Sequence, residues 1–411
     1  MTDHRSGVRF RSCAGCGEAD AQILHVQRFV VPEAYPLPGE YAVVRCNRCG
    51  FVYADTPAPQ EQYDQFYRDW SKYDDAATST GSGLNEYDAE RLRTTAADLA
   101  EALPLRNMRV LDAGCASGGL LRALRDLGLN AAGLDPSARC ADLCKEHGFA
   151  AYTGTITAPP REMPQFDCLV ASHVLEHVCD IPAFFRALRK LIKTGGYLYL
   201  ETPDAARYAD YLYAPFQEFN TEHINHFSGI SLTNVVCRFG FELVVVRSKL
   251  LQTSEKHFYP AVFGIFRLLP EPGNSCNGGR DETLLADVAR YIEQSQAMMH
   301  EIGKSLEQQL EDEPAVSLWG AGQLAMKLLD LPALRERKVV AVLDSNPVLH
   351  GKRLAGAPVM PPEAGVGRNE PIVISTLLHE EQIASRICQL MPGSRIVRLL
   401  PGGASMETRA S

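Results

Sequence analysis

Two pairs of cysteines in the first fifty residues have the spacing of a metal site. Cys13 and Cys16 lie in CAGCG, and Cys46 and Cys49 lie in CNRCG. The glycine after each pair permits the positive φ angle that lets backbone amides point at thiolate sulfur. Two such turns can supply four thiolates to one tetrahedral zinc ion, which is a closed structural site. Redox-active or accidental pairs are the alternative, and the repeated glycine-followed spacing favours zinc.

A second constellation lies in VLDAGCASGGLLRALRDLGLNAAGLDPS, residues 110–137. At a strand-to-helix turn, Gly114 and Gly118 would let the backbone approach a ligand closely, and Asp135 at the end of the next strand could accept hydrogen bonds from ribose. The string differs from the GxGxxG that binds pyrophosphate, because Asp112 precedes the first glycine. An acid there suits a ligand with a positive amino group. S-adenosylmethionine carries both that group and a ribose.

The surrounding pattern predicts an α/β fold that would position these residues. Between residues 108 and 201, the short apolar strands MRVLDAG, NAAGLD, FDCLVAS and GYLYLET alternate with helical stretches. This alternation is typical of a parallel sheet covered by helices. We also expect helices at 85–103 and 281–313, and a second, smaller α/β unit from Ala315 onward. The expected segments are a zinc-binding domain at 1–75, a cofactor-binding domain at 76–250, a helical linker at 251–314 and a C-terminal α/β domain at 315–411.

Composition limits the classes of partner. The 411 residues are 45% hydrophobic and 22% charged with a net charge of −9, so a nucleic-acid partner is not expected. No stretch approaches ~18 uninterrupted apolar residues, which disfavours a membrane span. The N-terminus has no apolar core of a secretory signal, and paired cysteines without one indicate metal binding in a reducing cytoplasm. We expect a cytoplasmic monomer with a small-molecule substrate.

The motifs VLDAGCASG, FDCLVASHVLEHV and GGYLYLETP, together with Asp135, resemble those of class I S-adenosylmethionine-dependent methyltransferases over residues ~85–250. The resemblance implies a Rossmann-like methyltransferase core at 76–250. Ala116 stands where many relatives have glycine, and its small side chain leaves the assignment intact. Another Rossmann-like nucleotide domain is the alternative. The residues implied to contact the cofactor are Asp112, Gly114 and Gly118 at the methionine moiety, Asp135 at the ribose, and Ser172 and His173 beside it.

The whole arrangement resembles the nucleotide-sugar C-methyltransferases of deoxysugar biosynthesis, which combine zinc knuckles, a methyltransferase core and a C-terminal Rossmann-like α/β domain. The C-terminal likeness depends on LWGAGQLAMKLLD and VVAVLDSNPVLHGKRLAGAPVMPPE. In NTEHINHFS, a family element that lies near the sugar is matched by Glu222, His223, Phe227 and Ser228.

This resemblance implies methylation at carbon through an enediolate, made by removing a proton next to a ketone. His223 is the candidate base, since imidazole titrates near neutrality, and His226 could replace it. Glu222 would orient the base or hold a sugar hydroxyl. His177 would stabilise the enolate oxygen. The alternative is that it has no acid–base role, because LEHV also occurs in class I methyltransferases in which this histidine does not act as an acid or base. Tyr73 would close over the sugar, or it packs against the zinc unit.

Other readings stay open. Asn220 stands where the sugar enzymes have tyrosine, and the glycine loop is closer to generic methyltransferases. O- or N-methylation of another small molecule, in a natural-product or surface-polysaccharide pathway, is therefore the alternative function. A nucleic-acid or protein methyltransferase would need a basic groove, and no run of basic residues supplies one. A non-catalytic scaffold would have no need for Asp112 and Asp135.

The C-terminal domain contains a second glycine turn after a strand, with a less specific sequence pattern than the turn at 114–118. Gly320 and Gly322 resemble a dinucleotide turn, and Asp344 ends the next strand. In the related enzymes this domain has a Rossmann-like shape and helps to form the substrate cleft, so we expect a scaffold without an NAD site. His379 and Glu380 are expected at the surface.

Overall fold

A computed structural model describes residues 11–70, 81–104, 107–271 and 279–400 of the chain. The chain divides into two compact units, and each is described by itself. Unit 1 comprises Met1–Leu24, Ala42–Arg207 and Glu222–Asp287, and unit 2 comprises His25–Tyr41, Tyr208–Thr221 and Val288–Ser411. Residues 25–41 and 208–221 thus belong to unit 2, although the sequence analysis assigned them to the zinc-binding and cofactor-binding segments.

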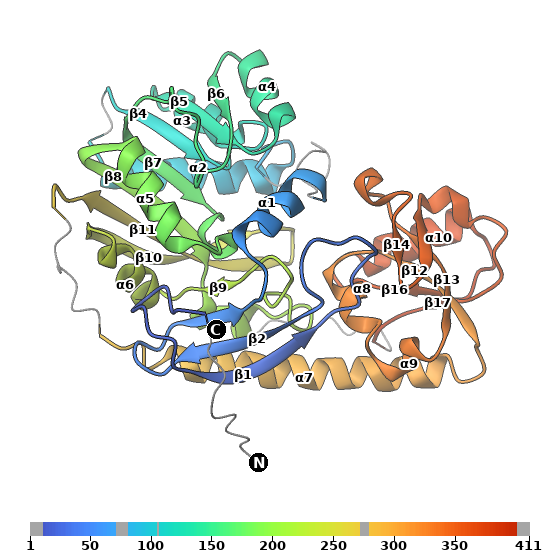
Figure 1. Ribbon diagram of the computed structural model, residues 1–411. Helices are drawn as coiled ribbons and strands as arrows, with labels where there is room; N and C mark the ends of the chain where they lie inside the picture. Colours follow the sequence, from blue (N-terminus) through green and yellow to red (C-terminus); the bar gives the residue numbers. More distant parts are fainter. Residues whose placement is uncertain (1–10, 71–80, 105–106, 272–278, 401–411) are drawn as a thin grey trace. The chain divides into compact units, whose positions relative to one another are not determined.

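The larger sheet of unit 1 has seven strands among the described residues (Figure 1). In sheet order the strands are β10 (Phe241–Gln252), β11 (Phe258–Leu268), β8 (Ile192–Pro203), β7 (Phe166–Ser172), β4 (Arg109–Ala113), β5 (Asn130–Asp135) and β6 (Ala150–Thr153). Five neighbouring strands, β8 to β6 in this order, are parallel. The sixth, β11, runs antiparallel to them, and the edge strand β10 is antiparallel to β11 and therefore parallel to the five.

Counted along the chain, this sheet has the order 3-2-1-4-5-7-6. It follows the doubly wound order 3-2-1-4-5-6, with one further strand inserted antiparallel between the fifth and sixth. The strands that follow β4 along the chain are added first on one side of it, as β5 and β6, and then on the other, as β7 and β8. Open α/β sheets bind ligands at such a reversal of strand order. The α/β fold class and Rossmann-like core expected from the sequence are confirmed.

Strand β11 lies inside the segment 251–314, for which the sequence analysis expected a helical linker. Its residues FYPAVFGIFRL are nearly all apolar, and most are buried between β8 and β10. A strand buried on both faces shows no alternation of polar and apolar residues, so periodicity alone does not reveal it. The sheet of unit 1 therefore continues 18 residues beyond the predicted boundary at 250, to Leu268.

Helices cover both faces of this sheet (Figure 1). In β7, Cys168 and Val170 belong to the apolar cluster shared with the helices of one face, whereas Leu169 and Ala171 belong to the cluster of the opposite face. The first group is α2 (Glu86–Ala102), α3 (Gly119–Asp126) and α4 (Ala138–Glu146), and the second is α5 (Ile181–Leu191) and α6 (Gly229–Arg238). Helix α2 confirms the helix predicted at 85–103.

A smaller sheet precedes the core, with strand order β1-β2-β3-β9. Strands β2 and β3 form an antiparallel pair around the second cysteine turn, and β3 also pairs with β9. Helix α1 (Gln60–Asp69) follows, in a region where the sequence shows little helical periodicity. The bounds are β1 (Ala21–Arg28), β2 (Glu40–Cys46), β3 (Val52–Asp55) and β9 (Asn225–His226).

Unit 2 is built on a second α/β sheet with the order β14-β15-β13-β12-β16-β17, parallel except for β14. The strands are β12 (Ala315–Trp319), β13 (Lys338–Leu343), β14 (Arg353–Leu354), β15 (Ala357–Met360), β16 (Ile372–Ile374) and β17 (Ile396–Val397). The helices are α7 (Leu284–Gln309), α8 (Gln323–Leu328), α9 (Pro332–Arg335) and α10 (Glu380–Leu390). Helix α7 matches the helix predicted at 281–313. Strand β12 begins at Ala315, where the second α/β unit was predicted to begin. Glu380, expected at the surface, is buried at the start of α10, whereas His379 is exposed.

Long-range aromatic contacts explain why two short segments join unit 2. The Tyr291 ring on α7 lies 5.3 Å from that of Tyr208 and 5.1 Å from that of Phe219, and the His25 ring stacks on Phe216 at 4.4 Å. Such pairings are not visible in local sequence patterns. Within the described ranges, no helix has both the length and the apolar character needed to span a bilayer.

Candidate functional site

The glycine turn after β4 needs its glycines for two reasons. Gly114 and Gly118 have φ angles of 83° and 85°, which L side chains rarely adopt. An added Cβ would also lie 3.1 Å from Val174 Cγ2 at the first position and 3.0 Å from Cys144 Sγ at the second. Ala116, between them, adopts a left-handed φ of 45°. Both the positive φ angles and the close packing therefore require glycine at positions 114 and 118.

Asp135 fixes this turn from the end of β5. Its Oδ2 accepts a hydrogen bond from the N–H of Ala116, and its Oδ1 accepts one from the N–H of Ser137, both at 2.9 Å. The Gly114 N–H donates to the carbonyl of Leu134 at 2.7 Å. Asp135 therefore holds the turn through backbone amides at both of its carboxylate oxygens.

Asp112 lies at the carboxyl end of β4 and is only 4% exposed. Burial, and secondly the negative charge of Asp135, raise the pKa of its carboxyl to about 7. A cationic group bound beside it would favour the carboxylate and lower that pKa again. The position is thus suited to a ligand that carries positive charge.

Ser172 and His173, at the end of β7, both contact the buried carboxylate of Glu201. Ser172 Oγ donates to Glu201 Oε1 at 3.0 Å, and His173 Nε2 lies 3.2 Å from the same oxygen. The other ring nitrogen, Nδ1, lies 3.2 Å from Glu176 Oε1. Glu201 is completely buried and also contacts Lys249 and the hydroxyl of Tyr199.

These contacts set the charge of His173. Burial acts to lower its pKa, but the hydrogen bonds and charges of Glu176 and Glu201 outweigh burial and raise the pKa to about 9. Burial would raise the pKa of the Glu201 carboxyl, yet Lys249 and His173 hold it well below its usual range. His173 is therefore a cation at neutral pH, placed between two carboxylates.

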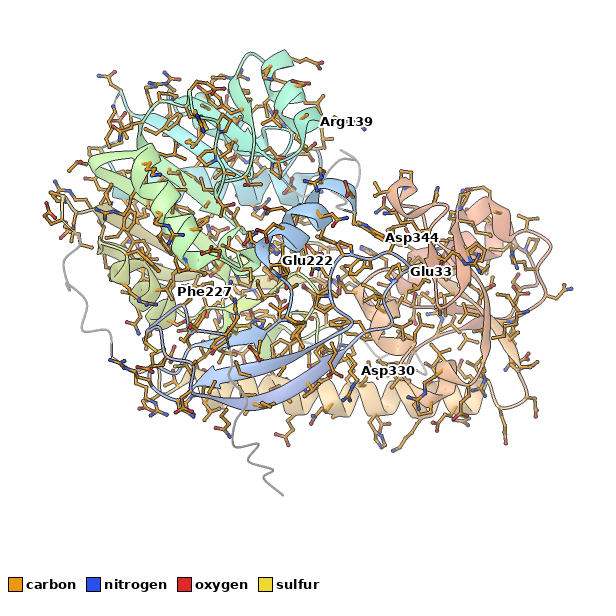
Figure 2. The ribbon with its side chains drawn as sticks, viewed as in Figure 1. Glu33, Arg139, Glu222, Phe227, Asp330 and Asp344 are labelled. Carbon is orange, nitrogen blue, oxygen red and sulfur yellow. The ribbon has the colours of Figure 1, made fainter. Side chains whose placement is uncertain are left out.

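A second cluster contains the residues expected to act on the substrate. His177 Nδ1 donates to the backbone carbonyl of Glu222 at 3.2 Å, and its ring centroid lies 4.8 Å from that of His223. Burial lowers the pKa of His177. The Tyr67 hydroxyl on α1 donates to Glu222 Oε2 at 3.3 Å, and Figure 2 shows Glu222 beside this helix. Tyr73, the fourth expected catalytic residue, lies outside the described residues.

Two elements hold the loop that carries Glu222 and His223. On one side, the N–H of Ile224 donates to the carbonyl of Glu176, in the short 3-10 helix η2 (Leu175–His177), at 2.9 Å. On the other side, Ile224 accepts from the N–H of Ala54 at 2.9 Å and β9 pairs with β3. The Asn225 amide adds bonds to the carbonyls of residues 175 and 178 at 3.1 and 2.8 Å. The loop is therefore fixed beside η2.

The second half of NTEHINHFS has a structural role. His226 is fully buried in β9, and burial lowers its pKa to about 3, which makes it a poorer base than the partly exposed His223. The buried Phe227, labelled in Figure 2, packs its ring 5.1 Å from that of Phe51. Ser228 caps α6 in a capping box with Ser231.

Three residues of these clusters were missed in the sequence. Tyr67 lies in a helix that periodicity did not reveal, and nothing in its neighbourhood marks it. Glu176 and Glu201 lie within LEHV and LYLET, which were quoted as motifs without a role for the acids. An acid inside an apolar run is a usable signal, because an ionised carboxylate is rarely buried unless it is paired.

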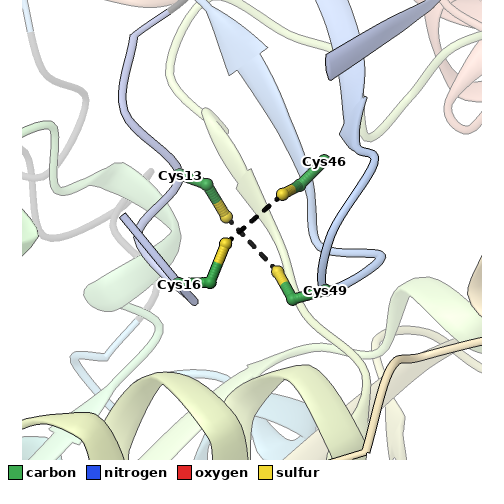
Figure 3. Close-up of side chains that lie close together, drawn as sticks. All are labelled: Cys13, Cys16, Cys46 and Cys49. Carbon is green, nitrogen blue, oxygen red and sulfur yellow. Dashed lines mark hydrogen bonds between the residues drawn. The ribbon is translucent and has the colours of Figure 1, made fainter. Parts of the chain in front are cut away.

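The four N-terminal cysteines converge, as Figure 3 shows. The Sγ atoms of Cys13 and Cys49, and those of Cys16 and Cys46, lie 3.4 Å apart. Four thiolates at the usual zinc distance of about 2.3 Å would be about 3.8 Å apart, so the donor set fits a tetrahedral ion. The glycines that follow the pairs, at residues 17 and 50, adopt the predicted positive φ angles of 86° and 82°.

Comparison with known proteins agrees with this geometry. Residues 84–246 match a family model described as a methyltransferase domain, so unit 1 contains a methyltransferase domain of the class I fold. Ubiquinone biosynthesis O-methyltransferases of Methylocella silvestris and Methylobacterium nodulans are 34% and 35% identical over 105 and 111 residues. These matches cover 24% and 26% of this chain and 41% and 45% of the relatives. The chain therefore spans less than half the length of the curated relatives it matches.

Among solved structures, the chain is similar to a 1,6-didemethyltoxoflavin-N1-methyltransferase of Burkholderia thailandensis. The identity is 15% and the TM-score 0.39, over 54% of this chain and 96% of that one. A methyltransferase of Mesorhizobium loti is 17% identical with a TM-score of 0.35, over 43% of this chain and 99% of the other.

Replacing His173 by glutamine is expected to remove part of the pH dependence of stability. A pKa raised from about 6.5 to about 9 stabilises the fold fully below pH 6.5, and that contribution is lost as the pH rises through 9. Its upper size is about 3 kcal/mol. Urea unfolding at about pH 6 and pH 9.5 should show a larger loss of unfolding free energy for the natural protein than for His173→Gln. Equal losses would contradict the assignment, and His147→Gln, at an exposed histidine, is the control.

Proposed function

We propose that the protein is an S-adenosylmethionine-dependent methyltransferase that methylates a carbon atom of a nucleotide-linked keto-deoxysugar. The main observation in support is that His177, the last residue of η2, lies against Glu222 and His223, which are on a loop bonded to η2. That turn directly follows Ser172 and His173 on the chain, at the carboxyl end of β7. The expected catalytic residues thus lie close in the fold to the proposed cofactor residues.

The proposed cofactor residues fit S-adenosylmethionine. The buried Asp112 suits its ammonium group, Gly114 and Gly118 allow the left-handed turn in which the backbone would approach the ligand, and the Asp135 carboxylate at the end of β5 would accept from the ribose hydroxyls. Ser172 and His173 would lie beside it. When bound, S-adenosylmethionine supplies an electrophilic methyl group.

In the proposed reaction, His223 removes the proton next to the ketone, and the electron pair moves onto the carbonyl oxygen. His177 donates its Nδ1 proton to the backbone carbonyl of Glu222. Its Nε2 can therefore donate a hydrogen bond to the substrate's carbonyl oxygen only when the ring is protonated. Burial outweighs the Glu176 carboxylate, 3.8 Å from Nε2, and lowers the pKa of His177, so protonation of this ring would have to accompany substrate binding. The Glu222 carboxylate, bonded to Tyr67, is placed to bind a sugar hydroxyl.

O-methylation of another small molecule is the second candidate. The observation that favours it is that the curated relatives are named O-methyltransferases, and their matches fall on part of this chain only. In that case His223 would remove a proton from a hydroxyl group. No enolate would form, and the substrate would not need a ketone.

Calorimetric titration with S-adenosylhomocysteine, followed by dTDP and GDP in its presence, tests the proposal. We expect the first ligand to bind, and Asp135→Asn to weaken it about tenfold or more because a charged acceptor for ribose is lost. Asp142→Asn, at an exposed acid of α4, is the matched control. Binding of S-adenosylhomocysteine without either nucleotide would contradict the nucleotide-linked acceptor. Failure of S-adenosylhomocysteine to bind would contradict the methyltransferase proposal.

Proton abstraction is tested by exchange of substrate hydrogen with deuterated water, using a dTDP- or GDP-linked keto-deoxysugar and S-adenosylhomocysteine. His223→Asn should lower the exchange rate about 10²- to 10⁴-fold, the usual contribution of a general base, while S-adenosylhomocysteine still binds. His226→Asn is the matched variant, because it changes the histidine three residues later, in β9. Loss of exchange in His226→Asn alone would contradict the assignment of the base.

We also propose that Cys13, Cys16, Cys46 and Cys49 bind one structural zinc ion. Elemental analysis of the purified protein should find one zinc per chain, and Cys46→Ser should abolish it and lower the melting temperature. Cys388→Ser, at an exposed free cysteine, should retain the metal and the melting temperature. Retention of zinc in Cys46→Ser would show that the ion lies elsewhere.

A further inference from the structure

The segment that leads into the first cysteine turn carries an arginine that binds the loop of His223. Arg11 lies two residues before Cys13, which Figure 3 labels. Its Nη2 donates to the backbone carbonyl of Ile224 at 2.9 Å and to Oδ1 of Asn225 at 2.8 Å. These acceptors lie 213 and 214 residues after Arg11, and they directly follow His223. The start of the cysteine module therefore contacts the loop that carries the proposed base.

Arg11 is itself held by β3. Its backbone N–H donates to Asp55 Oδ1 at 2.8 Å, and its carbonyl accepts from the Tyr53 hydroxyl at 3.1 Å. The guanidinium lies over the Tyr53 ring, with Cζ 4.9 Å from the ring centroid, which is a cation–π contact. A side chain that is already ordered loses little further entropy when it binds the loop. Arg11 is therefore suited to fix the position of its two acceptors.

The side-chain amide of Asn225 extends this contact to η2, which contains His177. Nδ2 donates to the carbonyls of Leu175 and Val178 at 3.1 and 2.8 Å, while Oδ1 accepts from Arg11. The orientation of the amide follows from its partners, because a guanidinium only donates and a carbonyl only accepts. Asn225 is 1% exposed, and a buried amide that loses a partner is costly. Arg11, Asn225 and η2 thus form one chain of contacts.

The loop has further backbone bonds that do not involve Arg11. The Ile224 carbonyl also accepts from the N–H of Ala54 at 2.9 Å, and the Ile224 N–H donates to the carbonyl of Glu176 at 2.9 Å. These bonds remain when the guanidinium is removed, whereas Oδ1 of Asn225 loses a charged donor. We therefore expect that the loss of Arg11 loosens the loop without unfolding unit 1.

We propose that Arg11 is a positioning residue for proton abstraction, which holds His223 relative to His177 through Asn225 and the loop backbone. The inference rests on the proposed function for the roles of the two histidines, whereas the contacts that carry it are independent of those roles. It gives the N-terminal cysteine module a part in the chemistry. The segment that enters its first metal-binding turn also sets the geometry of the proposed base.

Hydrogen exchange of the loop backbone tests the positioning without any substrate. In Arg11→Met, the amide hydrogens of residues 222–227, followed by mass spectrometry, should exchange with deuterated water about tenfold faster than in the natural protein, because a charge-assisted bond is lost. The amides of the cofactor turn, 114–118, should exchange as before. Arg48→Met, at an exposed arginine of the second cysteine turn, is the matched control. Equal exchange of residues 222–227 in Arg11→Met and the natural protein would overturn the proposal.

The effect on catalysis is measured as exchange of substrate hydrogen in a dTDP- or GDP-linked keto-deoxysugar. At saturating substrate, Arg11→Met should lower this rate about 10- to 100-fold, the cost of a misplaced catalytic group, while S-adenosylhomocysteine binds as before. Arg11→Lys keeps the charge and a donor, so it should recover part of both the rate and the loop protection. A looser loop with an unchanged rate would show a purely structural role and overturn the proposal.

A second variant keeps the test decisive if Arg11→Met fails to fold. Asn225→Ala interrupts the same chain of contacts and should lower the rate of substrate exchange by a similar factor. Where both variants fold, their combination should cost less than the product of the two separate effects, because they remove one connection. Effects that multiply would overturn the proposal. If the natural protein exchanges no substrate hydrogen, the proposed function fails, and the loop amides still show whether Arg11 fixes the loop.

Discussion

The buried carboxylate of Glu201 is the interaction on which the site of unit 1 depends. A charge taken out of water is costly unless it is paired and hydrogen-bonded, and residues from three strands supply partners to Glu201. Lys249 comes from β10, the Tyr199 hydroxyl from β8 itself, and Ser172 and His173 from the end of β7. The same carboxylate thus joins the antiparallel edge of the sheet to the strand end that leads into η2.

Much of the geometry of the turn at which we propose that the cofactor binds was predictable because its signals are local. Gly114, Gly118 and Asp135 are close in the sequence, and each has a role that its residue type dictates: a left-handed backbone, a close contact, or two accepted amide bonds. Strand β11 was not predictable in the same way. Its apolar residues form a strand between β8 and β10, and only the folded sheet brings these two neighbours together.

The cluster proposed to act on the substrate was predictable only in part. Glu222, His223 and His177 were found through a motif, and the structure places them in one cluster. Tyr67 reaches that cluster from a helix 155 residues earlier in the chain, and no local pattern connects residues so distant. The distinction between His223 and His226 also needed the fold, since only burial separates two histidines three residues apart.

The position of β11 affects how the molecule can be divided. The segment that matches the methyltransferase family, 84–246, ends within β10 and omits β11. In the whole chain, β8 pairs with β11 from Tyr197 to Pro203. A fragment cut at the family boundary would leave that edge unpaired and apolar, which is a template for aggregation between chains. A working fragment of this enzyme core would therefore have to extend at least to Leu268.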